Sequence, residues 1–376
     1  MQEMPLDELC EDFAPRSNAK LIASVHLDDL LRVACDRGAS DLHLAVGLPP
    51  VVRVDGSLQH LDYTPLAPTD TQRLVYDILT TDQVQWFEKT RELDFSYGVK
   101  AVGRFRINVY RQRGSVGAAL RAIPDRIPNY EQLGLPSIIR EISKKHSGLV
   151  LVTGPTGSGK STTIACMIDA INAEYPLHIM TIEDPIEYLH RHKKAMINQR
   201  ELNSDTDSFE NALRAVLRED PDVILIGEMR DLETISAALT LAETGHLVFG
   251  SLHTRNAPQT IDRVIDVFPP HQQDQIKVQL SNTLEAVIAQ QLCPRIGGGR
   301  VAAIEIMLAT SAVRNLIREG KTYQVYSVLE TGGQLGMQTM DKVLAGLYKD
   351  GFITNEEAIA RAIDRENYMR FLQGGN

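Results

Sequence analysis

The sequence lacks any hydrophobic run long enough to cross a membrane. A membrane-spanning helix needs about 20 apolar residues, whereas the longest apolar segments, GLVLV at 148–152 and VILIG at 223–227, have the length of buried strands. The first residues, MQEMPLDELCEDFAP, are acidic and have neither the basic start nor the apolar stretch of a secretory signal. We therefore expect a cytoplasmic protein that reaches any membrane only through a partner.

Cysteine is scarce and positive charge is in deficit. The cysteines form no CxxC pair and no metal-ligand spacing, which favours isolated reduced thiols; they are Cys10, Cys35, Cys166 and Cys293. The formal net charge is -10 at pH 7. Because phosphate backbones and anionic lipids attract cationic proteins, this charge argues against broad binding to nucleic acid or to a membrane surface.

The first part of the chain has the pattern of an α+β domain. Residues 1–25 are polar and lack a clear period, so we predict a loosely ordered extension. Residues 26–123 follow as a compact domain that begins with a helix at Leu27, which Gly38 ends. Further helices are expected near 68–80 and 81–89, and short, mostly antiparallel strands at 41–46, 51–56, 57–61, 93–98, 103–113 and 116–123.

A proline-punctuated stretch separates this block from the rest of the chain, and we place the linker at 124–136. In the second domain, 137–376, near-continuous apolar strands alternate with longer helical segments, which indicates a parallel sheet covered on both faces. These strands are expected at 149–153, 178–182, 223–227 and 246–250. After about residue 270 the pattern becomes mainly helical, apart from a hairpin expected around Gly297-Gly298-Gly299.

Residues 154–161 read GPTGSGKS and match the phosphate-binding pattern GxxxxGK[ST] in full. Glycines let such a loop curl so that backbone N–H groups point at phosphate oxygens. Lys160 supplies a positive charge for the β- and γ-phosphates, and the Ser161 hydroxyl can ligate Mg²⁺. We therefore predict ATP and Mg²⁺ as ligands. The residues expected to bind the nucleotide here are Gly154, Pro155, Thr156, Gly157, Ser158, Gly159, Lys160, Ser161 and Thr162.

Acidic residues follow two of the expected parallel strands. The segment PDVILIGEMRD places Glu228 after an apolar strand, and we assign this carboxylate to the Mg²⁺ water shell. The segment TIEDPIEY ends another strand in Glu183, Asp184 and Glu187. Because the carboxyl ends of parallel strands meet at one edge of the sheet, these acids should face the nucleotide. Each acid alone could be a helix cap or a solvated charge, and which of them is the catalytic base stays open.

Histidines and arginines complete the set of candidate site residues. His246 precedes the strand in GHLVFGSLHT, and His253 follows it, where a side chain can sense or polarise the γ-phosphate. A histidine beside an apolar strand can equally be a structural hydrogen-bonding group. Arg214 and Arg218 lie one helical turn apart on one helix face. Salt bridges to nearby acids are the simpler explanation of both arginines.

Together, these motifs resemble those of the secretion-ATPase superfamily and, within it, those of the type IV pilus retraction ATPases. GPTGSGKS, TIEDPIEY, DPDVILIGEMRD and ETGHLVFGSLHT stand in the family's order. AVRNLIREGK at 312–321 resembles the AIRNLIRE motif tied to retraction, with Val313 in place of the usual Ile, and GMQTMD at 336–341 resembles the family's tail. The four-cysteine zinc insertion usual in extension and type II secretion ATPases has no counterpart, which favours retraction. The resemblance covers residues 26–365, and residues 1–25 depart from it.

The resemblance implies an architecture and an activity. It implies a RecA-like P-loop ATPase domain of the α/β class behind a smaller, PAS-like α+β domain. It also implies a homohexamer that hydrolyses ATP and powers pilin removal and twitching motility. Such a motor works in the cytoplasm at the pilus base, against a platform protein of the inner membrane.

The resemblance also implies roles for particular residues near the γ-phosphate. Glu187 is the implied catalytic carboxylate, Glu228 the Walker B acid that serves the metal, and His253 a member of the His box. With Lys160, these residues form the expected catalytic set.

Other residues are implied to reach the nucleotide from elsewhere. Arg106 and Arg121 match arginines of the first domain that contact nucleotide in related ATPases, although an arginine on a strand is otherwise an ordinary edge charge. Arg214 and Arg218 match the paired arginines before the Walker B strand, and His246 is the second His-box residue.

Three alternatives stay open at this point. An accessory or extension ATPase of a pilus or of type II secretion would share the same motifs. A non-hydrolysing nucleotide-binding subunit would do so as well, although no motif position is lost. A RecA-like nucleic-acid motor would use the same fold, but we find no run of Lys and Arg interleaved with aromatic residues, and we expect no nucleic-acid partner.

Overall fold

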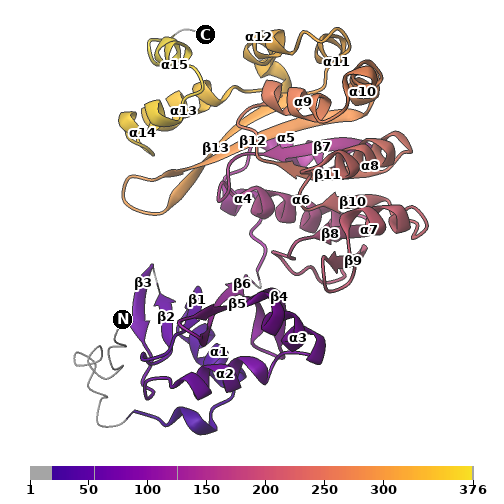
Figure 1. The fold of residues 1–376 in the computed structure, drawn as a ribbon. Helices are drawn as coiled ribbons and strands as arrows, with labels where there is room; N and C mark the ends of the chain where they lie inside the picture. Colours follow the sequence, from indigo (N-terminus) through magenta and orange to yellow (C-terminus); the bar gives the residue numbers. More distant parts are fainter. Residues whose placement is uncertain (1–18, 55, 125, 375–376) are drawn as a thin grey trace, which may run out of the picture. The chain divides into compact units, whose positions relative to one another are not determined.

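The computed structural model describes residues 19–54, 56–124 and 126–374. The chain divides into two compact units, Met1–Asp125 and Arg126–Asn376 (Figure 1). Most of the predicted extension 1–25 lies outside the described residues.

The first unit is a 6-stranded antiparallel sheet with the strand order β3-β2-β1-β6-β5-β4. Its strands are β1 (Asp41–Leu44), β2 (Val51–Val54), β3 (Ser57–His60), β4 (Glu92–Val99), β5 (Gly103–Gln112) and β6 (Ser115–Ile123). A short 3₁₀ turn, η2 (Ile22–Ser24), precedes the helices α1 (Leu27–Asp36), α2 (Pro68–Tyr76) and α3 (Thr81–Thr90). The strands and helices expected from the sequence are confirmed in this unit.

Buried and polar side chains alternate along β5, which shows which face of the sheet the helices cover. Phe105 and Ile107 are buried in one hydrophobic cluster with Leu30 of α1, Leu74 of α2 and Phe87 of α3. The intervening arginines of the strand point to the opposite face, since successive side chains of a strand alternate between faces. The helices therefore cover one face, and the other face carries polar side chains.

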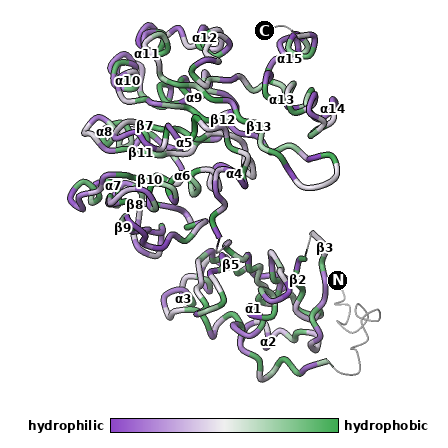
Figure 2. The backbone as a smooth tube through the Cα atoms, turned by 180° about the vertical axis from the view of Figure 1, so that it is seen from behind, coloured by the Kyte–Doolittle hydropathy of each residue, from purple (hydrophilic) through white to green (hydrophobic). Residues whose placement is uncertain are grey.

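The second unit contains a 7-stranded sheet with the order β13-β12-β7-β11-β10-β8-β9. All its pairings are parallel except that of β12 with β13. The strands are β7 (Gly148–Thr153), β8 (His178–Glu183), β9 (Met196–Glu201), β10 (Val223–Ile226), β11 (Leu247–Leu252), β12 (Leu284–Pro294) and β13 (Arg300–Leu308). Every residue of β7 and β11 is buried, and these central strands are largely hydrophobic along the tube in Figure 2. The parallel sheet and the hairpin expected from the sequence are confirmed.

Helices lie on both faces of this sheet. Buried residues of α4 (Tyr130–Leu133), α5 (Ser137–Ile142) and α6 (Lys160–Glu174) belong to the cluster on one face. The other face is packed by α7 (Phe209–Val216), α8 (Leu232–Glu243), α9 (Ala257–Asp266), α10 (Pro270–Thr283), α11 (Ser311–Arg318) and α12 (Val325–Thr331). Short 3₁₀ turns flank α12, namely η3 (Thr322–Gln324) and η4 (Gly332–Leu335). The chain ends in α13 (Met340–Lys349), α14 (Asn355–Arg361) and α15 (Arg365–Leu372), which share a small core with Cys293 and Ala303.

Part of the predicted linker 124–136 contributes to the second unit. Residues 130–133 form α4, and Tyr130 is buried in the cluster beneath α6, where its hydroxyl lies 2.7 Å from the Ser143 hydroxyl. The strand β9 was not expected from the sequence. It lies at the edge of the sheet, so its residues MINQRE are largely polar and lack the apolar run that marks the central strands.

Candidate functional site

The loop between β7 and α6 has the backbone geometry of a phosphate cradle. Gly154 has φ 142 and Gly159 has φ 89, conformations that residues with side chains rarely adopt. A Cβ at Gly154 would collide with the carbonyl oxygen of Gln290, and one at Gly159 would lie 2.7 Å from the Gln290 amide nitrogen. The helix begins at Lys160, so the free N–H groups of its first turn lie beside the loop. The predicted strand, loop and helix are confirmed.

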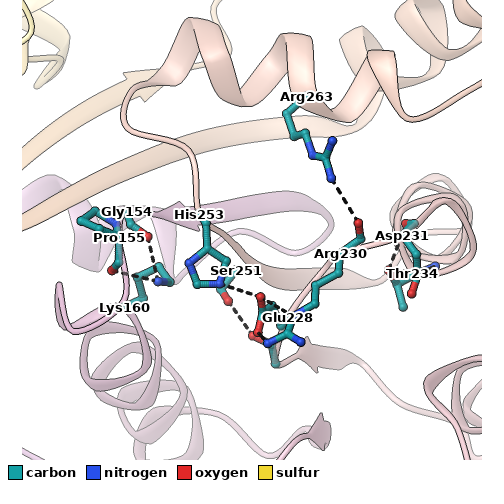
Figure 3. A network of polar contacts seen from close by, with 11 residues as sticks. Gly154, Pro155, Lys160, Glu228, Arg230, Asp231, Thr234, Ser251, His253 and Arg263 are labelled. Atoms are coloured by element: carbon teal, nitrogen blue, oxygen red, sulfur yellow. Dashed lines mark hydrogen bonds and ion pairs between the residues drawn. The ribbon is translucent and has the colours of Figure 1, made fainter.

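Lys160 is buried and folded back onto this loop. Its Nζ donates to the carbonyl oxygens of Gly154 (2.8 Å) and Pro155 (3.2 Å) (Figure 3). Burial lowers the pKa of Lys160 below its usual range, and the carboxylates of Glu228 and Glu187 act in the opposite direction. Because carbonyl oxygens can only accept hydrogen bonds, these two contacts stabilise the charged ammonium form, which attracts an anionic ligand.

The loop also leaves a polar atom for a ligand to satisfy. Among the residues that the structure describes, the buried Ser158 hydroxyl has no hydrogen-bond partner. Buried polar atoms in folded proteins normally have one, so an unpaired hydroxyl inside a glycine-rich loop fits a bound phosphate. The donors present here, backbone N–H groups, a hydroxyl and an ammonium, suit a nucleotide. The Ser161 hydroxyl and the Glu228 carboxylate are oxygen ligands, which Mg²⁺ prefers.

Glu228 follows β10 and is held by two partners. His253, directly after β11, donates from Nε2 to Glu228 Oε1 at 2.6 Å, and Arg230 donates to both carboxylate oxygens, each at 2.6 Å. Figure 3 shows this cluster beside Lys160. Burial alone would raise the pKa of Glu228, but the hydrogen bonds from Arg230 and His253 outweigh it and lower the pKa below its usual range. The Walker B carboxylate of Glu228 is therefore ionised, and its two partners fix the orientation of the side chain.

The acidic segment after β8 joins the same edge of the sheet. Glu183 ends this strand, and its Oε1 accepts hydrogen bonds from Thr181 (2.6 Å) and from Gln199 of β9 (3.2 Å). Burial raises the pKa of Glu183 to about 7, although these hydrogen bonds act against the shift. The Tyr188 hydroxyl lies 2.8 Å from the Thr162 hydroxyl, which ties the segment to the first turn of α6.

The structure thus brings together a core of the predicted site within one chain. Glu187 is exposed and, like Glu228 and His253, it follows the carboxyl end of a parallel strand of the sheet. The phosphate loop, the two candidate acids and His253 therefore converge at the carboxyl edge of the sheet. This edge is where ligands bind in open α/β sheets.

His246 lies away from this cluster. It precedes β11, and its backbone oxygen accepts from the N–H of Gly148 at the start of β7 (3.0 Å). At a rise of about 3.3 Å per residue, the loop at the far end of that strand is ~20 Å away. The His246 ring hydrogen-bonds locally, with Nδ1 2.9 Å from the Leu241 carbonyl oxygen.

Three of the predicted arginines pair with acids that do not belong to the phosphate loop. Arg214 is exposed on α7 and donates to Glu210 at 2.6 Å. This is a salt bridge to a nearby acid, the simpler explanation given above for this arginine. Arg218 lies just after the end of the same helix. Arg106 and Arg121 belong to the first unit. They are cross-strand partners on β5 and β6 and form ion pairs with acids of the adjacent strands, Asp94 (2.6 Å) and Asp41 (2.9 Å) respectively.

Sequence reasoning missed two residues that hold the site. Arg230 lies two residues after the Walker B acid, Glu228, in GEMRD, so this short separation in the sequence could have identified it as a site residue. Gln290, on β12, lies 130 residues beyond Lys160 in the sequence and contacts the loop from a neighbouring strand. Only the order of strands in the sheet reveals that contact.

Comparison with known proteins assigns the family. Residues 17–298 match the model of the family described as "Type II/IV secretion system protein". The chain belongs to this family. It is 52% identical over 342 residues to the type IV pilus retraction ATPase PilT of Pseudomonas aeruginosa, covering 91% of this chain and 99% of that protein. It is 49% identical over 319 residues to a twitching motility protein of Neisseria gonorrhoeae, covering 85% of each.

A solved structure of this family supports the same assignment. The crystal structure of the pilus retraction motor PilT with bound ADP matches with a TM-score of 0.87 and 52% identity, over 92% of this chain and 100% of that one. The resemblance, the RecA-like α/β fold and the ATPase class expected from the sequence are confirmed. In the described part of the chain, no helix combines the length and the hydrophobicity that a membrane span requires.

Proposed function

We propose that this chain is the ATP-hydrolysing motor of type IV pilus retraction. The observation that carries the proposal is the glycine-rich loop with its buried Lys160, beside which Glu228 is held by His253 (Figure 3). Phosphoryl transfer needs positioning and neutralisation of charge, and this set supplies both. The relatives named for pilus retraction support the choice of pilus retraction over other work for the same ATPase site.

Within one chain, each member of the set has a chemical task. Residues 154–162 bind the phosphates through backbone N–H groups, hydroxyls and the Lys160 ammonium. Ser161 and Glu228 would hold Mg²⁺, directly and through its water shell, and the metal when bound neutralises charge on the β- and γ-phosphates. Glu187 orients the attacking water. His253 and Arg230 keep the Glu228 carboxylate aimed.

The remaining predicted site residues act from a neighbouring subunit of a homohexameric ring. His246 lies at the far end of β11 from the loop, and Arg214 and Arg218 are exposed, so in this proposal these three residues serve a subunit interface. Arg106 and Arg121 are opposed across β5 and β6. Both guanidinium groups are exposed, so an anionic ligand such as the nucleotide can reach them. Asp94 and Asp41 hold them in place until it binds.

The work of the motor is the removal of pilins from the pilus base. ATP turnover would be coupled to movement between the two units about the segment between β6 and α4, within 124–136. The ring would act in the cytoplasm, at the inner membrane, against a platform protein. The motif at 312–321 supports retraction: Val313 and Ile317 are buried under α11, whereas Asn315 and Arg318 are exposed and available to a partner.

Phosphate release by the purified protein tests the proposal. Lys160→Ala and Glu228→Ala should each lose turnover, because one removes the phosphate charge and the other the metal-directed carboxylate. Addition of DNA or RNA should leave the wild-type rate unchanged. Turnover like that of the wild type in both variants would overturn the ATPase site, and strong stimulation by nucleic acid would favour the nucleic-acid motor.

A further inference from the structure

Gln290 is a buried amide that spans the base of the phosphate loop. It lies on β12, one residue beyond the pairing of Ala289 with Thr153 at the end of β7, and its exposed fraction is 3%. Its Nε2 donates to the carbonyl oxygen of Ser158 at 2.7 Å. Its Oε1 accepts from the hydroxyl of Thr163, in the first turn of α6, at 2.7 Å. Both ends of one amide are therefore used between the loop and its helix.

We propose that Gln290 is a positioning residue that holds the phosphate loop in its binding curvature. The inference rests on the proposed role of residues 154–161 in phosphate binding. Gln290 itself does not touch the phosphates in this account. It acts through the backbone of Ser158 and through the helix that begins at Lys160.

The two hydrogen bonds require an amide. The Ser158 carbonyl oxygen can only accept, so the NH₂ group must face it, and this fixes the orientation of the Gln290 side chain. The carbonyl end then faces Thr163, whose hydroxyl donates. A glutamate would lose the donor and place a charge in a buried site, and an aliphatic side chain would leave both partners unpaired.

The loop glycines lie against the same residue. A Cβ at Gly154 would collide with the backbone oxygen of Gln290, and a Cβ at Gly159 would meet its amide nitrogen at 2.7 Å. The start, the end and the following helix of the loop thus all contact one residue of β12. Because the N–H groups that receive phosphate oxygens belong to this loop, a change in its curvature misplaces all of them together.

Substitution of Gln290 should therefore weaken nucleotide binding without removing any group that touches the nucleotide. We expect Gln290→Leu to raise the Kd for ADP and the KM for ATP about tenfold, because two buried polar groups lose their partners and the loop relaxes. Gln290→Glu should be at least as impaired. Thr163→Val, which removes one of the two bonds, should raise the Kd for ADP about threefold, and Thr163→Ser should bind ADP like the wild type.

The neighbouring glutamine is a matched control. Gln291 follows on the same strand with its side chain on the opposite face, where its Nε2 lies 3.3 Å from the Arg361 carbonyl oxygen. Gln291→Leu makes the same chemical change one residue away from the loop. Its Kd for ADP should stay within twofold of the wild-type value.

The experiment measures ADP binding by calorimetry, ATP turnover, and thermal unfolding without nucleotide, on the full-length protein. The proposal is supported if Gln290→Leu is folded, raises the Kd and KM as stated, and differs from Gln291→Leu. It is overturned if the two leucine variants bind ADP equally. Should Gln290→Leu fail to fold, the Thr163 pair decides: equal ADP affinity of Thr163→Val and Thr163→Ser would overturn it. The Lys160→Ala variant tests separately whether the loop binds phosphate. If this variant binds ADP as tightly as the wild type, the loop is not the nucleotide site.

Discussion

Arg314 of the AVRNLIREGK segment should be a structural arginine, and its replacement should destabilise the second unit. Its guanidinium donates from Nε to the Ala309 carbonyl oxygen (2.8 Å) and from Nη1 to the carbonyl oxygens of Ser281 (2.6 Å) and Asn282 (2.9 Å). Its Nη2 lies 2.6 Å from Glu285 Oε1. The Ser281 and Asn282 carbonyls belong to the last turn of α10, so Arg314 fixes that helix end to the base of β12.

The expected cost follows from these contacts. A hydrogen bond to a charged group contributes ~1.5–3 kcal/mol, and removing one partner of a largely buried ion pair costs ~3–5 kcal/mol. Glu285 keeps a second cation, Lys145 at 2.9 Å, and the helix end can be rehydrated. We therefore expect Arg314→Ala to lower the free energy of unfolding of the second unit by about 3 kcal/mol.

A matched variant lies one turn further along the helix. Arg318 is exposed, and its Nη1 is 3.5 Å from the Ser281 hydroxyl, a contact at the outer limit of a hydrogen bond. Arg318→Ala should change the free energy of unfolding by less than about 0.5 kcal/mol, as surface substitutions usually do.

Urea unfolding of both variants tests this difference. The single tryptophan, Trp86, lies in α3 of the first unit, so its fluorescence should report no shift in either variant. Circular dichroism reports both units and should show an earlier transition in Arg314→Ala alone. Equal stability of the two alanine variants would refute the structural role assigned to Arg314.

Three further predictions follow from the site. Glu228→Gln keeps the shape of the side chain but removes its charge, so ATP turnover should fall by about 100-fold or more while ADP affinity changes little; unchanged turnover would contradict the metal role. Burial raises the pKa of Glu183 to about 7 from an ordinary 4.5, so the folded state binds this proton more tightly and stability is lost as pH rises from about 4.5 to 7. Glu183→Gln should therefore show a weaker fall of urea stability over that range, and identical pH profiles would contradict the shift. Rings that mix Arg106→Ala and Lys160→Ala subunits should regain part of the ATP turnover that rings of either variant alone lack. Mixed rings that stay as inactive as the separate variants would place Arg106 in the site of its own chain.

Local sequence signals were sufficient for the central sheet and the phosphate loop. Runs such as GLVLVT of β7 are buried on both sides, so their hydrophobicity marks them without any knowledge of their neighbours. The GPTGSGKS loop carries its glycines and its lysine within eight consecutive positions, so those residues alone are enough to recognise it. The acids that follow β8 and β10 could be placed because parallel strands end at one edge.

Contacts between distant segments could not be predicted in this way. Gln290 is one polar residue in a long strand, and nothing in its neighbours shows that β12 lies beside β7. The edge strand β9 is largely polar, yet it supplies Gln199, which holds Glu183. His246 and His253 belong to one short motif, but they lie at opposite ends of β11, so shared membership in a motif does not place two residues in one site.

Counting surface pili after deletion of the gene tests the central claim most directly. A retraction motor removes pilins, so its loss should leave excess pili that do not retract, and a plasmid-borne wild-type copy should restore retraction. A Lys160→Ala copy should not restore retraction, because hydrolysis of the ATP bound at the phosphate loop drives it. Loss of surface pili in the deletion strain, or full rescue by the Lys160→Ala copy, would contradict the claim.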